Sequence, residues 1–544
     1  MSVGTVAGEL RRPGAGAAAP RARTLSGPTA ATVAALTLLA AVLRFTRIGH
    51  QGFWFDEANT AQLVHFSPGK MLGLIPQSES TPPLYYSVAW IWARVFGYGE
   101  AGLRSLSAVL GVALVPVAFA TGAKLSSRRA GLIAAALVAC SPLLNWYSQE
   151  ARSYEMLAFL ASASLLAFAY ARDDPTPRAL AVWVITSALA LATHYYAVLI
   201  VAPEALWLLA MHRRRREVQI AFGFVGLCGL GLLALALAQN ANGRDRWIAG
   251  APLGRRLGQV VPQFAVSFEG PGRGVLEPLA IAIIVLALVL LATCARAAER
   301  RGALVAGSLA LAGLVISLVL IALGFDDLLT RNLLALWLPA ALVVAGGLAA
   351  PRPRAVGLVA AAALCLIGVV TTIGVAVDRN YQRPDWRVVA RVLGPAPTFG
   401  SPAGGGSPTG AGSLAGAGRP AGAGSPTRAI LVQHYRDLLP LSLYTPGLKF
   451  MPRHGARVRE FYVVSFTSPA SAGFCWWGSA CNLWPSVMQA AYPVPGFHEV
   501  SRRRALQFTV LKMVSSRPVQ LTPAEVARVL RTTRFRNDEL LIQR

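Results

Sequence analysis

Charged side chains are scarce in this sequence. Of its 544 residues, 14% are charged and 54% are hydrophobic, whereas soluble domains average about 25% charged residues. This composition excludes an ordinary soluble chain. The apolar runs at 275–291, 303–323 and 333–350 approach or exceed the ~18–20 residues that a helix needs to cross a bilayer. We therefore predict a polytopic membrane protein.

Acidic residues are the rarer of the charged ones, at 25 against 51 lysines and arginines, which gives a formal net charge of +26. An excess of this size can indicate a nucleic-acid partner. Here, however, many basic residues form short clusters between apolar runs, which is typical of cytoplasmic loops in membrane proteins. We therefore expect no nucleic-acid partner. The clusters are Lys124/Arg128/Arg129, Arg213 to Arg216, Arg296/Arg300/Arg301 and Arg352/Arg354.

The first apolar run lacks a convincing small-residue cleavage site, and the chain has no evident internal repeat. Arg44 and Arg47 follow this run directly, so we interpret it as an uncleaved first span rather than a secretory signal. Residues 1–28 are expected to form a basic, disordered cytoplasmic N-terminus.

Residues 29–377 are predicted to form a transmembrane domain of about 11 helices. The outer loop at 46–102 contains two amphipathic pieces, 57–74 and 83–96, which we interpret as interfacial helices. An odd number of spans that starts inside leaves the C-terminus outside, so we expect a multi-pass plasma-membrane protein with a cytoplasmic N-terminus. The predicted spans are 29–45, 103–123, 130–146, 154–171, 179–193, 195–211, 219–238, 275–294, 303–323, 333–350 and 355–377.

Residues 378–544 differ in character from the spans and are expected to form a small extracytoplasmic α/β domain. Within them, 394–427 consists almost wholly of Gly, Ala, Pro, Ser and Thr. Such a composition cannot bury enough apolar surface to order itself, so we predict a disordered insertion. The expected elements are a helix at 385–393 and strands at 429–433, 461–466 and 508–513.

Cysteines number only six. Four lie in or beside apolar runs, where a lone cysteine is normally a packing residue. The other two, Cys475 and Cys481, lie close together in the C-terminal region. A disulfide between them suits an oxidising outer compartment, and we predict one. No metal-ligand set accompanies the pair.

Two acids stand among aromatic residues just after the first predicted span, in the sequence Phe53-Trp54-Phe55-Asp56-Glu57. An ionised carboxylate near hydrocarbon is costly, so acids placed there usually meet a cation, a metal or a substrate. A helix N-terminus is the alternative interpretation, because acids favour the first turn and aromatic rings favour the membrane interface.

Other unusual polar residues fall on the same, outer side of this topology. A cluster of acids and arginines at one membrane surface suits an anionic lipid-linked substrate. Alternatively, Arg104 and Arg152 extend to lipid headgroups, and His194 belongs to an interfacial aromatic belt. The group comprises Glu79, Arg104, Gln149, Glu150, Arg152, Tyr154, His194, Tyr195, Asp326, Asp327, Arg331 and Asn332.

Five motifs occur in one order: Asp56-Glu57, Pro82-Pro83-Leu84-Tyr85-Tyr86, Arg104, Ser148 to Tyr154 and Thr193-His194-Tyr195. Over about residues 30–390, this order and spacing resembles the GT-C membrane glycosyltransferases of the protein O-mannosyltransferase and lipid A aminoarabinose transferase type. The chain departs from the pattern at Thr81, where relatives often carry an acid or a histidine. The nearest acid is Glu79, which argues against a metal shared by Glu79 and His194.

The resemblance implies a GT-C fold and transfer of a sugar from a polyprenyl-phosphate donor on the outer membrane face, with inversion at the anomeric carbon. It implies that Asp56 is the general base or orients the acceptor hydroxyl, with Glu57 as its helper. Arg104, Arg152 and Arg331 would hold the departing lipid phosphate, which suits a guanidinium fork. Further substrate contacts are expected from Glu79, Tyr85, Gln149, Glu150, Tyr154, His194 and Tyr195.

The predicted function is therefore a membrane glycosyltransferase that moves mannose or a pentose to a glycan, lipid or protein acceptor. No cofactor is required; a divalent metal is left open, without a ligand set to support it. The alternative is a transporter or flippase of lipid-linked sugars. That alternative predicts polar residues at mid-membrane and broken helices in paired halves, whereas the polar residues here gather at one surface.

Overall fold

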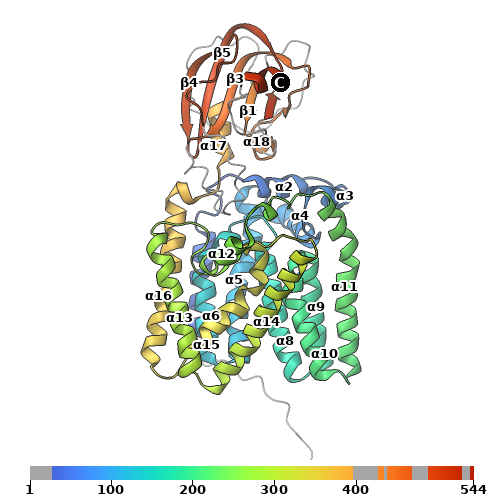
Figure 1. Ribbon diagram of the computed structural model, residues 1–544, viewed down its shortest axis with the longest axis vertical. Coiled ribbons are helices and arrows are strands. Elements are labelled where there is room, and N and C mark those ends of the chain that lie inside the picture. The colour runs from blue at the N-terminus through green and yellow to red at the C-terminus, as the bar shows by residue number, and fades with distance from the viewer. Residues whose placement is uncertain (1–26, 396–426, 434–437, 468–487, 530–538, 544) are drawn as a thin grey trace, which may run out of the picture.

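The computed structural model describes residues 27–395, 427–433, 438–467, 488–529 and 539–543. Within these residues, long helices stand side by side in a bundle, and a β-sheet domain lies beyond one end of it (Figure 1). Most of the predicted N-terminal segment at 1–28, most of the predicted insertion at 394–427 and the predicted Cys475–Cys481 pair lie outside the described residues.

Nine helices in the described part of the chain are long and apolar enough to cross a membrane, and the bent pair α6–α7 makes a tenth. Helix α9 is apolar but shorter, at 17 residues. With α9 included, the helices coincide with the eleven predicted spans, so the polytopic α-helical fold is confirmed. The bounds are α1 (Gly27–Phe45), α5 (Glu100–Leu125), α6 (Arg128–Cys140), α7 (Pro142–Ser148), α8 (Tyr154–Asp173), α9 (Pro177–Thr193), η1 (Tyr195–Ala197), α10 (Val198–His212), α11 (Arg216–Ala241), α13 (Arg273–Thr293), α14 (Ala297–Ala322), η3 (Thr330–Leu336), α15 (Trp337–Leu348) and α16 (Arg354–Val377).

The third predicted span is broken between α6 and α7, which meet at 55°. Pro142 begins α7, and a proline cannot continue the hydrogen bonding of the preceding helix. Carbonyls opened by such a break must find donors inside the membrane. Arg44 of α1 supplies them, because its guanidinium donates to the oxygens of Val138 at 2.9 Å and Ala139 at 3.2 Å.

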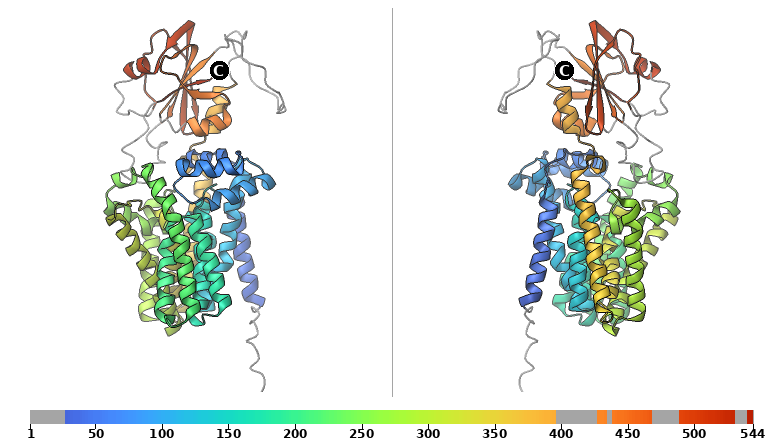
Figure 2. Two further views of the ribbon diagram at one scale, coloured as in Figure 1. Left: turned by 90° about the vertical axis from the view of Figure 1, so that its right-hand side faces the viewer. Right: turned by 90° about the vertical axis from the view of Figure 1, so that its left-hand side faces the viewer.

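Three short helices lie across one end of the bundle, between it and the sheet domain (Figure 2). They are α2 (Phe55–Leu63), α3 (Pro68–Ser78) and α4 (Leu84–Phe96). They share a small apolar core that includes Leu63, Met71 and Ile75 and to which Leu103 of α5 and Met156 of α8 also belong. The two amphipathic pieces of the first outer loop thus form helices that lie on the bundle rather than within it.

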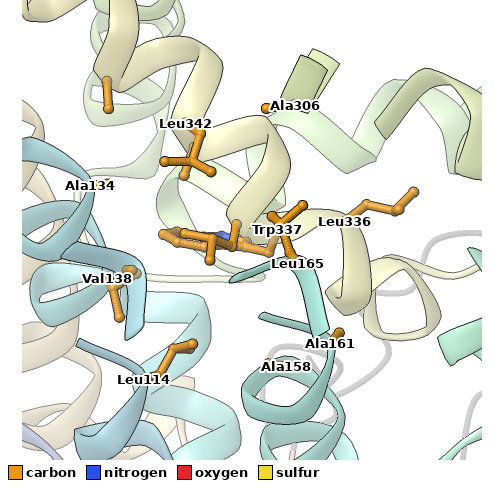
Figure 3. Close-up of a cluster of buried hydrophobic side chains, with 14 of the residues drawn as sticks. Leu114, Ala134, Val138, Ala158, Ala161, Leu165, Ala306, Leu336, Trp337 and Leu342 are labelled. Atoms are coloured by element: carbon orange, nitrogen blue, oxygen red, sulfur yellow. The ribbon is translucent and has the colours of Figure 1, made fainter. Parts of the chain in front are cut away.

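The centre of the bundle is packed around Trp337 of α15 (Figure 3). Leu114 of α5, Val138 of α6 and Leu165 of α8 belong to the same buried cluster. The indole nitrogen of Trp337 donates to the carbonyl of Phe264 at 3.3 Å, which satisfies the polar atom of a large buried ring. This core holds the helix ends that carry the polar residues described below.

The C-terminal domain is a six-stranded sheet of order β2-β6-β1-β3-β5-β4. Strands β1 and β3 are parallel, and the other pairs are antiparallel. Helices α17 and α18 lie on the side of the domain that faces the bundle (Figure 1). The bounds in this domain are β1 (Arg428–Val432), β2 (Leu448–Phe450), β3 (Ala456–Phe466), β4 (His498–Ala505), β5 (Phe508–Leu521), β6 (Glu539–Gln543), α17 (Trp386–Leu393), α18 (Leu438–Tyr444) and α19 (Pro523–Val529). Outside it, η2 (Ile248–Gly250) and α12 (Leu253–Val266) lie between α11 and α13, and η4 (Arg379–Tyr381) follows α16.

Backbones approach closely at Gly347 of α15, where an added Cβ would collide with the carbonyl of Ala287 in α13. Gly226 of α11 has nothing within 4 Å of such a Cβ. We expect Gly347→Ala to destabilise the fold by about 1–3 kcal/mol, the usual cost of overpacking, and Gly226→Ala to have no such effect. Thermal unfolding of the two purified variants in detergent measures this, and equal melting temperatures would contradict it.

Candidate functional site

A cavity of about 750 Å³ lies where the first outer loop meets the helix ends. Its wall combines residues of α2, the 78–81 segment, α8 to α11 and the 239–247 and 320–332 segments. Polar groups from distant parts of the sequence therefore face one space. The predicted site residues on this wall are Asp56, Glu79, Arg152, Tyr154, His194, Tyr195 and Arg331.

Asp56 lies in the first turn of α2, and its side chain is 21% exposed. Its Oδ2 atom is 3.4 Å from Nη1 of Arg331, a long contact for an ion pair. Arg152 reaches the same residue from another side, because its Nη1 donates to the main-chain carbonyl of Asp56 at 3.3 Å. The carboxylate is thus held near two cations and remains accessible from the cavity.

Glu57 is fully buried and does not line the cavity. Its Oε1 atom accepts from Nε of Arg104 at 2.7 Å and from the main-chain N–H of Ala151 at 2.9 Å, and its Oε2 accepts from Nη2 of Arg104 at 2.5 Å. Burial would raise the pKa of Glu57, but the charge and hydrogen bonds of Arg104 outweigh it, so the pKa is lowered. Glu57 is thus an ionised group that joins α2 to Arg104 of α5 and to the backbone at Ala151.

Arg104 uses all of its donors inside the protein. Besides its bonds to Glu57, it donates to the carbonyls of Ile48, Gln51 and Gly52 at 2.9–3.0 Å. These five bonds match the five N–H groups of a guanidinium. The structure thus places Arg104, expected to bind a phosphate, away from the cavity wall, with no N–H left for one.

Arg152 and Glu79 form an ion pair on the cavity wall, with 2.9 Å between Nη1 and Oε1. Asn59 also donates to this carboxylate oxygen, at 2.6 Å. Burial lowers the pKa of Arg152, but the Glu79 carboxylate outweighs this effect and the pKa is raised. Glu79 is thus engaged with a cation.

Among the described residues, no three His, Cys, Asp or Glu side chains gather into a metal-binding group.

Arg331 is fixed beside the cavity by aromatic faces. Its guanidinium carbon lies 5.6 Å from the ring centre of Tyr154 and 5.9 Å from that of Trp247. Cation–π contacts of this kind orient an arginine without neutralising it. Arg331 therefore presents positive charge to the cavity next to Asp56.

His194 is buried between α9 and η1 and lines the cavity. Its Nδ1 accepts from the main-chain N–H of Tyr196 at 3.3 Å, which assigns the ring proton to Nε2. Burial, reinforced by the positive charges of Arg331 and Arg152, lowers the pKa of His194 to about 3. The imidazole is therefore neutral near pH 7.

The segment 239–247, which comprises the end of α11 and the residues that follow it, closes one side of the cavity and was missed by sequence reasoning. Gln239 donates to the carbonyl of Thr81 at 3.2 Å, and Arg244 donates to that of Ser78 at 2.8 Å. The signal in the sequence was a set of charged and aromatic residues inside a polar, Gly-rich loop. The wall residues from this segment are Gln239, Asn240, Gly243, Arg244, Asp245 and Trp247.

Three predicted substrate contacts do not line the cavity, namely Tyr85, Gln149 and Glu150. Gln149 donates to the carbonyl of Arg44 at 3.0 Å. Glu150 accepts from Nη2 of Arg383 at 2.9 Å, and burial, opposed by Arg383, raises its pKa to about 7. In this structure these two side chains support the loop that carries Arg152.

The lower part of the cavity wall is apolar. It runs along α11 through Ala236 and Leu232 to Gly229 and includes Leu191 of α9 and Leu320 of α14. Gly229 lies twelve residues from the end of α11, which corresponds to about 18 Å at 1.5 Å per residue. The cavity thus continues from a polar chamber into the depth of the helical bundle.

Part of the sequence matches a protein-family model, and the fold matches solved structures. Residues 80–238 match the family model of dolichyl-phosphate-mannose-protein mannosyltransferases. No curated protein matches the sequence. The structure is similar to ArnT from Cupriavidus metallidurans in the apo state, at 14% identity and a TM-score of 0.52, over 89% of this chain and 98% of that one. It also matches ArnT bound to undecaprenyl phosphate, at 14% identity, a TM-score of 0.49 and the same coverage. A third match is the Archaeoglobus fulgidus oligosaccharyltransferase, at 15% identity and a TM-score of 0.45, over 84% and 71%.

The fold is that of the GT-C membrane glycosyltransferases, so the resemblance inferred from the ordered motifs is confirmed. The segment that matches the mannosyltransferase family contains Arg104, Arg152 and His194. Asp56 and Arg331 lie outside it, and the structure brings them to the same cavity.

The two adjacent acids should respond differently to substitution. We expect Glu57→Ala to destabilise the protein by about 3–5 kcal/mol, because it leaves the buried Arg104 without its counter-ion. Asp56→Asn should change stability little, because Asp56 is partly exposed and only loosely paired. Thermal unfolding in detergent measures both effects. A larger loss for Asp56→Asn than for Glu57→Ala would reverse the assignment.

Proposed function

We propose that the protein is a membrane glycosyltransferase that moves a sugar from a polyprenyl-phosphate donor to an acceptor hydroxyl on the extracytoplasmic face. One observation carries the proposal: a single cavity combines the Asp56 carboxylate, the Arg331 cation and an apolar wall that runs into the bundle. A donor of this class has matching parts, namely a sugar, a phosphate and a long hydrocarbon chain.

In the proposed reaction, Asp56 accepts the proton of the acceptor hydroxyl as its oxygen attacks the anomeric carbon. A new carbon–oxygen bond forms on one face of the sugar, and the bond to the phosphate oxygen breaks on the other. The configuration at the anomeric carbon is therefore inverted. The polyprenyl phosphate leaves with the bonding electrons and an increased negative charge.

Cations near the departing phosphate stabilise that charge. Arg331 is the leading candidate, since it lines the cavity and its contact with Asp56 is long. A bound phosphate would compete for its guanidinium and free Asp56 to act as a base. Arg152 lies on the same wall but is already paired with Glu79. His194 has a neutral ring with its proton on Nε2, and in the proposed reaction this N–H donates a hydrogen bond to the substrate.

The proposed side of the reaction follows from the positions of the basic clusters. Lys124 lies in the last turn of α5, Arg213 directly follows α10, and Arg300 lies in the first turn of α14. These helix ends lie at the end of the bundle opposite α2 and the sheet domain (Figure 1). Basic loops mark the cytoplasmic side. The cavity, the first loop and the C-terminal domain are accordingly assigned to the extracytoplasmic side, and the N-terminus to the cytoplasm.

Loss of the proposed base should stop transfer. We expect Asp56→Asn to lower the rate by at least about 10²-fold, the usual contribution of general base catalysis, while donor binding persists. Asp174→Asn, at an exposed position beyond α8, is the matched control and should retain activity. The assay incubates membranes with a panel of radiolabelled polyprenyl-phosphate sugars, mannose and pentose included, and follows the labelled product.

Retention of full activity by Asp56→Asn would overturn the role of this residue. A flippase would move donor across reconstituted vesicles without consuming it, so transport with no glycosylated product from any donor would overturn the proposed function itself. Which labelled sugar and acceptor react identifies the substrates.

The pH dependence of transfer should not originate from His194. Its lowered pKa favours the neutral ring in the folded protein, so its charge does not change between about pH 5 and 8. His194→Gln should therefore lower the rate by one constant factor across this range and leave the shape of the pH–rate profile unchanged. If an inflection near about pH 6.5 is present in the wild type and absent from the variant, the imidazole titrates and this assignment is wrong.

A further inference from the structure

The segment 48–53, directly before the helix that carries Asp56, is bound from two sides. From the bundle, Arg104 of α5 donates to the carbonyls of Ile48, Gln51 and Gly52. From the opposite side, the C-terminal domain supplies two further contacts. These contacts come from residues more than 300 positions later in the chain.

Tyr444 of α18 makes the central contact. Its hydroxyl oxygen accepts from the main-chain N–H of Phe53 at 2.6 Å and donates to Oε1 of Glu100 at 2.8 Å. Phe53 is only 4% exposed, and a buried N–H without an acceptor is costly. The Tyr444 hydroxyl thus satisfies a backbone group three residues before Asp56 and links it to the start of α5.

Arg387 of α17 adds a second contact to the same segment. Its Nη1 lies 3.4 Å from Oε1 of Glu100, and its Nη2 donates to the carbonyl of His50. The approach is close at Gly52, where an added Cβ would lie 2.5 Å from Oδ1 of Asp385 and 3.2 Å from the Tyr444 hydroxyl. Only a residue without a side chain fits between the loop and the C-terminal domain.

Apolar packing supports these polar contacts. Leu439, Leu443 and Tyr444 of α18 pack against the apolar core shared by α2, α3 and α4. Helix α2, which carries Asp56, therefore rests on the bundle on one side and on the C-terminal domain on the other. A domain that was only tethered to the bundle by a flexible linker would not form hydrogen bonds with the backbone of the segment 48–53.

We propose that Tyr444 is a positioning residue for the transfer reaction: through Phe53 it fixes the start of α2, and so holds the Asp56 carboxylate in its reactive place. The effect on catalysis rests on the proposed function. The contact between Tyr444 and Phe53 does not depend on it. The C-terminal domain is, on this view, part of the catalytic unit. Arg387 and Glu100 complete the same link.

The test uses the full-length protein in lipid nanodiscs. We expect Tyr444→Phe to lower kcat about 10- to 100-fold, since small displacements of a catalytic group have effects of this size. The KM for the donor should stay within about twofold, because the phosphate and lipid contacts of the cavity are unchanged. Glu100→Gln, which weakens the same link from the bundle, should lower kcat in the same direction.

Tyr492→Phe is the matched control. The Tyr492 hydroxyl also accepts from a main-chain N–H, that of Gln489 at 3.1 Å, but it belongs to the core on the other face of the sheet. Its loss should leave kcat unchanged. Wild-type kcat in Tyr444→Phe, or an equal fall in Tyr492→Phe, would overturn the positioning role.

Hydrogen exchange provides a readout that needs no activity. In Tyr444→Phe, the amides of residues 50–58 should exchange faster than in the wild type, while those of α18 and the sheet keep their protection. If the amides of residues 50–58 exchange faster in Tyr444→Phe but the wild-type protein transfers no sugar, the structural role of Tyr444 is supported and the proposed function is rejected. Unchanged exchange at 50–58, or faster exchange across all of α17 and α18, would reject the inference.

Discussion

The buried ion pair between Glu57 and Arg104 is the interaction on which the site depends. Two charges stay buried only if their remaining lone pairs and N–H groups are satisfied. Here Ala151 and three carbonyls of the first loop do so. The pair therefore fixes α2, the start of α5 and the 149–153 loop relative to one another. Adjacent helix residues point about 100° apart, so the direction of Glu57 into the bundle turns Asp56 toward the cavity.

The spans could be predicted because hydrocarbon thickness sets their length and basic loops set their ends. The region of Asp56 could also be predicted, since acids at a membrane surface need a partner. Which acid meets which arginine could not. Glu57 and Arg104 are 47 residues apart, and Arg104, Arg152 and Arg331 are all outer arginines in the sequence. Only their partners in space distinguish a structural cation from one that faces the cavity.

Contacts between loops account for the rest of what the sequence did not reveal. Gln239 and Arg244 bind carbonyls of the 78–81 segment, and a side chain that recognises a backbone carbonyl leaves no pattern in the residue that it contacts. The same holds for Arg383, which donates to Glu150 and to the carbonyl of Gln149 at 3.2 Å. Composition identified these segments as polar loops, but not which of them close the cavity.

A reactive carboxylate at a membrane surface presents a problem of rigidity. Loops at such a surface face water, which competes for every hydrogen bond that they make. Arg104 holds the segment before Asp56 from the bundle, where water is excluded, but it reaches only carbonyl groups. The N–H of Phe53 needs an acceptor from the other side, and Tyr444 provides it. If Asp56 acts as the base, its carboxylate must be positioned precisely. The C-terminal domain must therefore be docked against the first outer loop, so that Tyr444 contacts Phe53.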